Sequence, residues 1–168
     1  MNENTLLTTL KTRIQAATWT GGSTTIFGAG AVAVTANVDL ATTQMLKYGR
    51  VPACLLQPTS GSSDPEFNEE PDLIRLTVLL RVIAMVSGDS FGENALVGAN
   101  KSGGSTASEG RGITELIQEI YNTAGKLNAL ESYIIQVRQT GEANYIYAEG
   151  GKAIAWRDVE LEAWVTAT

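Results

Sequence analysis

A regular alternation of apolar and polar positions runs through the middle of the chain, from Leu73 to Val86. The odd-numbered positions are interrupted by Arg75, Thr77 and Arg81. Successive side chains of a β-strand point to opposite faces, so the pattern predicts a long strand with one core face and one mixed face. We expect it to be the central strand of a sheet, which either bends or projects beyond the core as an arm of a hairpin. The even-numbered, apolar face consists of Ile74, Leu76, Val78, Leu80, Val82, Ala84 and Val86.

Three further segments carry apolar residues at spacings of three and four, which is typical of a helix with one buried stripe. They are Asn4–Ala17, Asn37–Tyr48 and Ile113–Leu130. The second begins at an asparagine, one of the residues preferred at helix N-caps. The third is the most regular. We expect it to pack on the even-numbered face of the central strand, because an apolar strand face and an apolar helix stripe cover each other.

Shorter apolar runs predict the other strands of the sheet. Val51–Gln57 is expected to end at Pro58, and the Gly- and Ala-rich segment Thr24–Thr35 is expected to form a weak hairpin. The polar residues Thr59–Pro71 are expected to join Val51–Gln57 to the central strand as an antiparallel connection. Near the C-terminus the predicted elements are Tyr133–Arg138, a turn, and a returning strand Tyr145–Ala148.

The last predicted strand, Ala153–Val165, changes its phase part of the way along. Its second half alternates apolar with acidic residues, but Ile154 and Trp156 occupy the side that later becomes polar. This change of phase predicts a bulge or a bend near Arg157.

Three carboxylates, Asp158, Glu160 and Glu162, share one side of this last strand. If the strand pairs antiparallel with the central strand, they are expected to match its cations, Arg75 and Arg81. As an alternative, the three carboxylates could act as an acid/base pair or hold Mg²⁺. A solvated or interface surface opposite basic residues is the simpler interpretation.

The segment Ser87–Gly112 is rich in Gly and Ser and reads as a long loop. Loops of this length are uncommon inside compact domains and are usually functional or disordered. Its large apolar residues are Phe91, Leu96 and Val97. We expect the loop to be mobile in the free subunit and to become ordered at a subunit or partner interface, where these side chains can be buried.

Composition narrows the classes of function. The chain has 168 residues, 43% of them hydrophobic, which suits a single globular domain spanning residues 1–168. A net charge of −6 argues against a protein that grips nucleic-acid phosphates by itself. No apolar run is long enough for a membrane span, and the N-terminus does not read as a signal peptide, so we expect synthesis in the cytoplasm and no membrane partner.

Candidate chemistry is sparse in the sequence. With 0 His and one Cys, the chain lacks the Ser-His-Asp and Cys-His arrangements and the His/Cys metal clusters. Cys54 lies in an apolar run and is interpreted as a small core residue. Gly28-Ala29-Gly30 superficially resembles a dinucleotide loop, but apolar strand residues follow it instead of a helix. We therefore predict no catalytic residue, no cofactor and no bound metal.

Five segments taken together carry a resemblance to a known family. They are LLTTLKTRI, KYGRVPACLLQP, RLTVLLRVIAMV, GITELIQEIYNTAGKL and the closing WRDVELEAW. In this order they resemble the small tail-terminator and tail-completion proteins of long-tailed bacteriophages. The Gly- and Ser-rich loop after the central strand departs from that family's pattern.

The resemblance implies an α+β fold, with a curved and mostly antiparallel sheet packed by helices. It further implies a virion protein, assembled in the host cytoplasm as a hexameric ring that caps the tail tube, meets the head connector and lets DNA pass through its pore. Another neck or tail component, such as a tail-tube or head-completion subunit, is an alternative, and a small acidic enzyme is a second one. The candidate interface residues are Arg75, Arg81, Phe91, Leu96, Val97, Asp158, Glu160 and Glu162.

Overall fold

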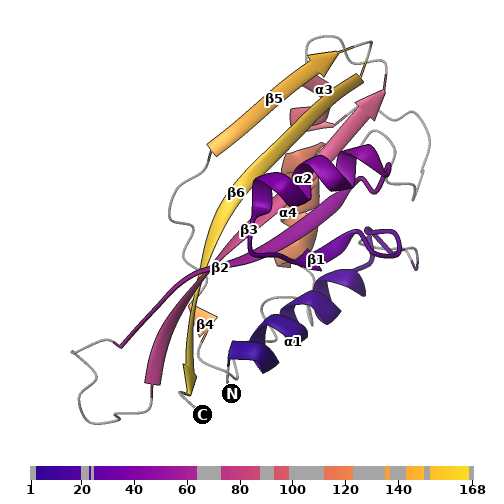
Figure 1. Ribbon diagram of the computed structural model, residues 1–168. Helices are drawn as coiled ribbons and strands as arrows, with labels where there is room; N and C mark the ends of the chain where they lie inside the picture. The colour runs from indigo at the N-terminus through magenta and orange to yellow at the C-terminus, as the bar shows by residue number, and fades with distance from the viewer. Residues whose placement is uncertain are drawn as a thin grey trace.

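The sheet of the computed structural model is built around β3 (Leu73–Ser87), which lies between β2 (Ala53–Ser63) and β6 (Lys152–Thr166) (Figure 1). The predicted central position of this strand is confirmed. Both neighbours run antiparallel to β3, and the short β1 (Val32–Val34) adds one parallel pair on the far side of β2. The fold is therefore α+β with a mostly antiparallel, open sheet. The structure describes residues 3–19, 23, 25–63, 73–87, 93–98, 112–122, 135–136, 143–149 and 152–166.

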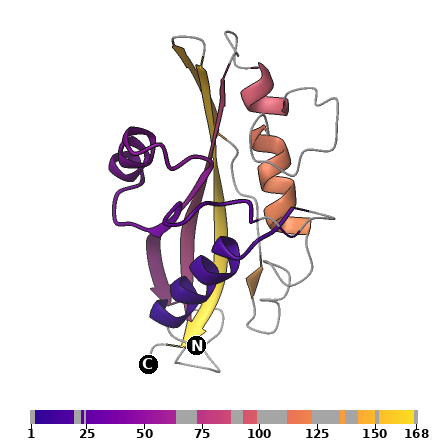
Figure 2. The same ribbon diagram turned by 90° about the vertical axis from the view of Figure 1, so that its right-hand side faces the viewer.

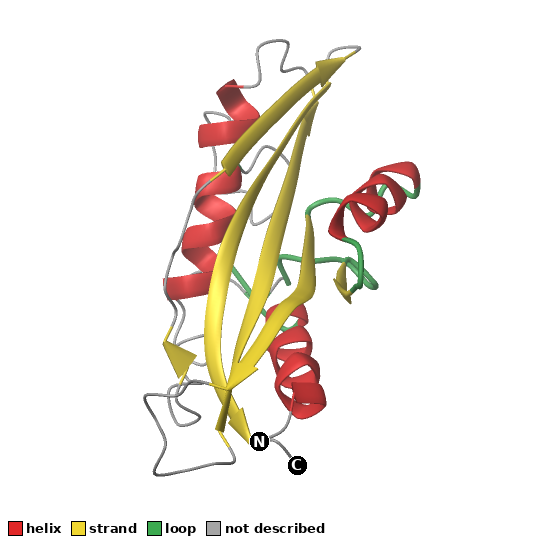
Figure 3. Cartoon of the chain, turned by 60° about the vertical axis from the view of Figure 1, so that its left-hand side comes forward, coloured by secondary structure: helices red, strands yellow, loops and turns green. Residues whose placement is uncertain are grey.

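The pairing of β3 with β6 is continuous over the full length of both strands. Leu73 lies opposite Thr166 and Ser87 opposite Lys152, with no shift of register between them. The predicted bulge near Arg157 is therefore wrong. The two long strands curve together along the molecule, as Figure 3 shows.

Two predictions about the strands before β3 are corrected. β2 does not end at Pro58 but continues to Ser63, with a shift of register between Pro58 and Ser60. Such a shift accommodates a residue that has no amide hydrogen to donate to the ladder. The segment Thr24–Thr35 does not form a hairpin, because its strand β1 pairs in parallel with β2.

The C-terminal strands are arranged differently from the predicted hairpin. β4 (Ile135–Gln136) and β5 (Ala143–Glu149) both pair antiparallel with β6, on the edge that β3 leaves open. They therefore run in the same direction, and Tyr145–Ala148 does not return beside Tyr133–Arg138 as expected. Two glycines separate Glu149 from its partner Lys152 and so connect β5 to β6.

Helices cover both faces of the sheet. Figure 2 shows α2 (Val38–Lys47) on one side, with α3 (Glu93–Val97) and α4 (Ile113–Asn122) on the other. The side chains of α1 (Glu3–Gln15) join those of α3 and α4 in the larger hydrophobic cluster, here called the main core. No helix among the described residues is long and apolar enough to cross a membrane.

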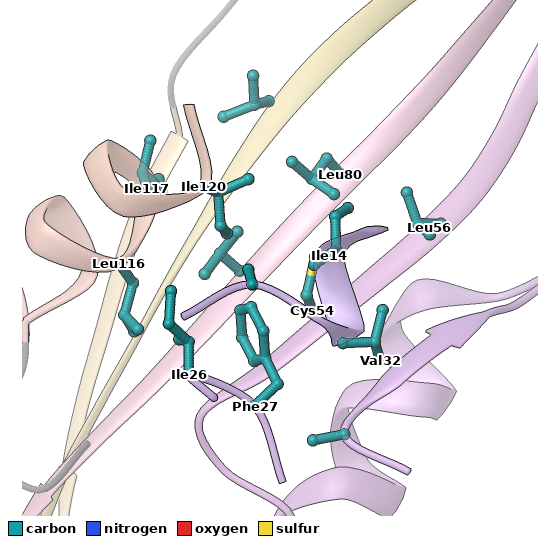
Figure 4. Close-up of a cluster of buried hydrophobic side chains, with 14 of the residues drawn as sticks. Ile14, Ile26, Phe27, Val32, Cys54, Leu56, Leu80, Leu116, Ile117 and Ile120 are labelled. Carbon is teal, nitrogen blue, oxygen red and sulfur yellow. The ribbon is translucent and has the colours of Figure 1, made fainter. Parts of the chain in front are cut away.

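The even-numbered side of β3 forms the floor of the main core, as predicted. Leu80 is fully buried there, and Leu116, Ile117 and Ile120 of α4 lie over the same cluster (Figure 4). Ile14 of α1 completes the cover. The predicted helix is described only as far as Asn122, and residues 123–130 lie outside the described part.

A second, smaller cluster lies under α2 and explains the phase of the last strand. It joins Val38 and Met45 of α2 to residues of β2 and β3, and Ile154 and Trp156 of β6 pack against it. These two side chains therefore lie on the α2 side of the sheet, which is also the side of the acidic positions of the same strand, and the register between β3 and β6 is continuous. An apolar patch under one helix, and not a bulge, produces the change of pattern.

The segment Ser87–Gly112 is not a loop throughout, because α3 forms within it. Ala95 is fully buried, and Leu96 packs against the main core. Gly98, with a φ of 96°, follows the last turn of α3 in a conformation that favours glycine. Residues 88–92 and 99–111 lie outside the described part, so the mobility of this segment remains a prediction.

Candidate functional site

Arg81 is the most buried charged side chain of the described residues and lies where three elements meet. It belongs to the odd-numbered side of β3, with 7% of its surface exposed. Asp158 is its direct cross-strand partner on β6. Asn37 caps α2 by accepting the backbone N–H groups of Asp39 and Leu40, and this cap places Asp39 in the first helical turn, beside Arg81.

The guanidinium group of Arg81 donates to carboxylates from two elements. Its Nε and Nη2 atoms donate to the two carboxylate oxygens of Asp158, each at 2.6 Å. Its Nη1 atom donates to Asp39 Oδ1 at 2.6 Å and to Thr42 Oγ1 at 3.3 Å. The Trp156 ring lies 5.7 Å from the guanidinium carbon. We call these five side chains the Arg81 cluster.

The Arg81 cluster fastens α2 and β6 to β3. Burial alone lowers the pKa of Arg81, but the hydrogen bonds and charges of Asp158 and Asp39 outweigh it and raise the pKa. Both oxygens of Asp158 accept bonds from one bidentate cation. Asp158 is therefore occupied in a structural ion pair, and this weakens the alternative in which it works as an acid or base.

The other acidic candidates lie on the same side of β6 as Asp158. Glu160 is opposite Leu79 and Glu162 is opposite Thr77, and all four are half-buried. Arg81 thus meets a carboxylate as predicted. Trp164 lies directly opposite Arg75 in the register, so the expected match of Arg75 with a carboxylate stays a prediction.

The three apolar candidates of the segment between β3 and α4 have different surroundings. Phe91 lies outside the described residues. Leu96 packs against the protein's own main core, whereas Val97 has 55% of its surface exposed. Of the two described candidates, Val97 is the one whose surface is open to a partner.

Cys54 is a core residue, as predicted. It is fully buried in β2, and burial raises the pKa of its thiol. A raised pKa keeps the thiol protonated and unreactive. Cys54 therefore contributes to packing in the main core.

One exposed group at the end of α2 was not predicted from the sequence. At the end of α2, the Tyr48 ring has Lys47 Nζ 5.7 Å and the Arg50 guanidinium carbon 5.9 Å from its centroid. Tyr48 has 63% of its surface exposed, and both cations are exposed as well. We call these three residues the α2-terminus patch. The run KYGR is the only feature of the sequence that indicates this group, and such a run is equally typical of an ordinary helix C-terminus.

Fold and site together define an α+β protein with an open sheet, helices on both faces and a buried ion-pair cluster between them. Within the described residues no group of three or more His, Cys, Asp or Glu is placed to hold a metal ion. No protein-family model matches the chain, and a search of curated proteins finds no match.

Proposed function

We propose that this protein is a structural virion subunit, which forms a ring that ends a phage tail tube and joins it to the head connector. The proposal comes from the resemblance of the five sequence segments described above. The structure supports it by the shape of the sheet and by the kinds of surface that the sheet presents.

The observation that carries the proposal is that the described residues cover only part of the α2 side of the sheet. α2 has ten residues and is about 15 Å long, whereas β3 and β6 have fifteen residues each and extend about 50 Å. Among the described helices only α2 lies on this side. The half-buried residues beyond it are Thr77, Glu160 and Glu162, and Leu79 lies at the border, where it packs against the cluster under α2.

A mixed polar and apolar face on a long sheet suits contact with another protein subunit. The partly apolar character provides area to bury, and the carboxylates give register and selectivity. A ring supplies such a contact to every copy, because each subunit presents the same pair of surfaces to its two neighbours. This surface is the reason for preferring an assembly protein to a small acidic enzyme.

The test is the assembly state of the purified chain. We expect light scattering to give a sixfold multiple of the 17.8 kDa subunit mass and electron microscopy to show closed rings with a central pore. Spontaneous growth of long tubes would instead favour a tail-tube subunit. A protein that stays monomeric at high concentration would contradict the proposal.

A further inference from the structure

The α2-terminus patch has the composition of a protein-binding surface. Tyr and Arg are enriched where protein interfaces are most tightly bound, and Lys47 adds a second cation on the same ring. Within the described part of the chain, neither Lys47 nor Arg50 is engaged in an ion pair. Arg50 instead lies against Gly30, where an added Cβ would come within 3.3 Å of its Nη1 atom. The guanidinium group therefore lies beside the turn before β1.

Leu40, in the first turn of α2, is a second exposed apolar side chain of this helix, whose C-cap residue is Tyr48. Leu40 has 60% and Tyr48 63% of its surface exposed. Exposed large apolar side chains beside cations suit a partner that is acidic and carries an apolar group of its own.

The chain itself contains a segment with this chemistry, the β2–β3 connection (residues 64–72). Its sequence is DPEFNEEPD, which has no cation and includes one large aromatic residue, Phe67. The connection lies outside the described residues, but the ends of β2 at Ser63 and of β3 at Leu73 fix where it starts and finishes. Its carboxylates are Asp64, Glu66, Glu69, Glu70 and Asp72.

The connection cannot reach the α2-terminus patch of its own chain. β2 begins three residues after Arg50 and runs for eleven residues, so Ser63 is about 35 Å from the start of the strand. The middle of the connection is about five residues from either fixed end, which allows a reach of about 17 Å at full extension. Figure 1 shows the shared end of β2 and β3 far from α2. Any contact between the two must therefore join different copies.

We infer that the α2-terminus patch of one copy binds the acidic β2–β3 connection of a second copy. Because the patch precedes the start of β2 and the connection follows its end, each copy can offer its connection to one neighbour and its patch to another. Such head-to-tail contacts close into rings or extend as filaments. The inference rests on the proposed function only for its expectation that the assembly is a closed ring.

A nucleic acid is the competing occupant of the patch. Two cations would release only a few counterions from a phosphate backbone, so they supply little free energy for binding a nucleic acid. Binding of a short DNA duplex that blocks self-association would therefore overturn the inference.

The test is a charge exchange, read by sedimentation velocity as the protein concentration at which half of the chain is assembled. The first variant is Lys47→Glu with Arg50→Glu, and the second is Glu66→Lys, Glu69→Lys and Glu70→Lys. Each is expected to raise the midpoint concentration by about tenfold or more, which corresponds to about 1.4 kcal/mol. The variant that combines both sets should return the midpoint to within about threefold of the wild type.

The matched control is Lys11→Glu with Lys152→Glu, which changes the net charge by the same amount at two other exposed lysines. It should leave the midpoint within about twofold of the wild type, because exposed charges away from the contact act weakly. Circular dichroism checks that every variant folds, and Lys47→Ala with Arg50→Ala replaces the first variant if that one does not.

The outcomes separate this inference from the proposed function. If the Lys47→Glu with Arg50→Glu variant still forms rings at the wild-type midpoint concentration, the inference is overturned and the proposed ring function stands. Filaments or pairs that the combined variant restores would support the inference and contradict the ring. A wild-type chain that never associates, or a combined variant that stays dissociated although it is folded, would overturn the inference.

Discussion

Replacing Arg81 tests the main energetic claim about the fold, that one buried cation fastens α2 and β6 to β3. Arg81→Ala removes the two hydrogen bonds to Asp158, together with the bonds to Asp39 and Thr42. It leaves the Asp158 carboxylate, whose side chain is only 17% exposed, without its cation. Breaking a buried pair by removing one partner strongly destabilises a protein.

The expected loss of unfolding free energy for Arg81→Ala is about 3 kcal/mol. Removal of one partner of a fully buried pair costs about 3–5 kcal/mol, and the partial exposure of Asp158 places this pair at the lower end of that range. Asp39 is different, because its side chain is 83% exposed. Asp39→Ala should therefore cost no more than about 1 kcal/mol. Arg81→Lys should recover only part of the loss, since an ammonium group cannot bond both oxygens of Asp158 in the same fork.

Urea unfolding followed by tryptophan fluorescence measures these differences. All variants are compared at one protein concentration, because self-association would make the apparent stability depend on concentration. In Arg81→Ala, the rate of hydrogen exchange should increase over that of the wild type more in α2 than in α4. A loss below about 1 kcal/mol for Arg81→Ala, or an equal loss for Asp39→Ala and Asp158→Ala, would refute the view that the buried Arg81–Asp158 pair dominates the cluster.

Three further predictions concern the main core and the segment after β3. Leu80→Ala should cost about 2–5 kcal/mol in the same unfolding assay, because Leu80 is fully buried under α4, and a cost under about 0.5 kcal/mol would place it on a solvated face. Cys54 should resist a thiol reagent at pH 8 until the protein unfolds. The pKa of Cys54 is raised in the folded state, so above about pH 8.5 only the unfolded chain loses the thiol proton. The free energy of unfolding should therefore fall as the pH rises further. It should fall less steeply in Cys54→Ala. Finally, hydrogen exchange across residues 87–112, apart from α3, should be fast in the free subunit and slower in the assembly, whereas equal protection in both states would mean that the segment folds on its own domain.

Part of the sheet could be predicted because β3 alternates regularly along its length. The even-numbered side of β3 and the apolar stripe of α4 are both local patterns, and each needs cover, so their contact followed from the sequence. That Arg81 meets a carboxylate of β6 followed in the same way, from opposite charges on two strands expected to be neighbours, whereas the register that selects Asp158 did not. Where one face of an element is buried, the periodicity of its residues carries most of the information.

The rest depended on contacts between residues far apart in the chain. Nothing near Asp39 in the sequence indicates that it meets Arg81, and its place in a first helical turn already has a local explanation. Ile154 and Trp156 suggested a bulge because the apolar patch under α2, which covers them, cannot be seen from β6 alone. Pro58 suggested the end of a strand, whereas a shift of register allows β2 to continue past it.

The central claim, that this chain forms a ring at the junction of a phage tail and head, is tested most directly by locating the protein in particles that carry it. Antibody raised against the purified chain and marked with gold should label one site per particle, where the tail meets the head. The Lys47→Glu with Arg50→Glu variant, used as the antigen in parallel, checks that labelling does not depend on the α2-terminus patch. Labelling along the whole tail, over the capsid or at the far tail tip, or no labelling of particles at all, would contradict the account.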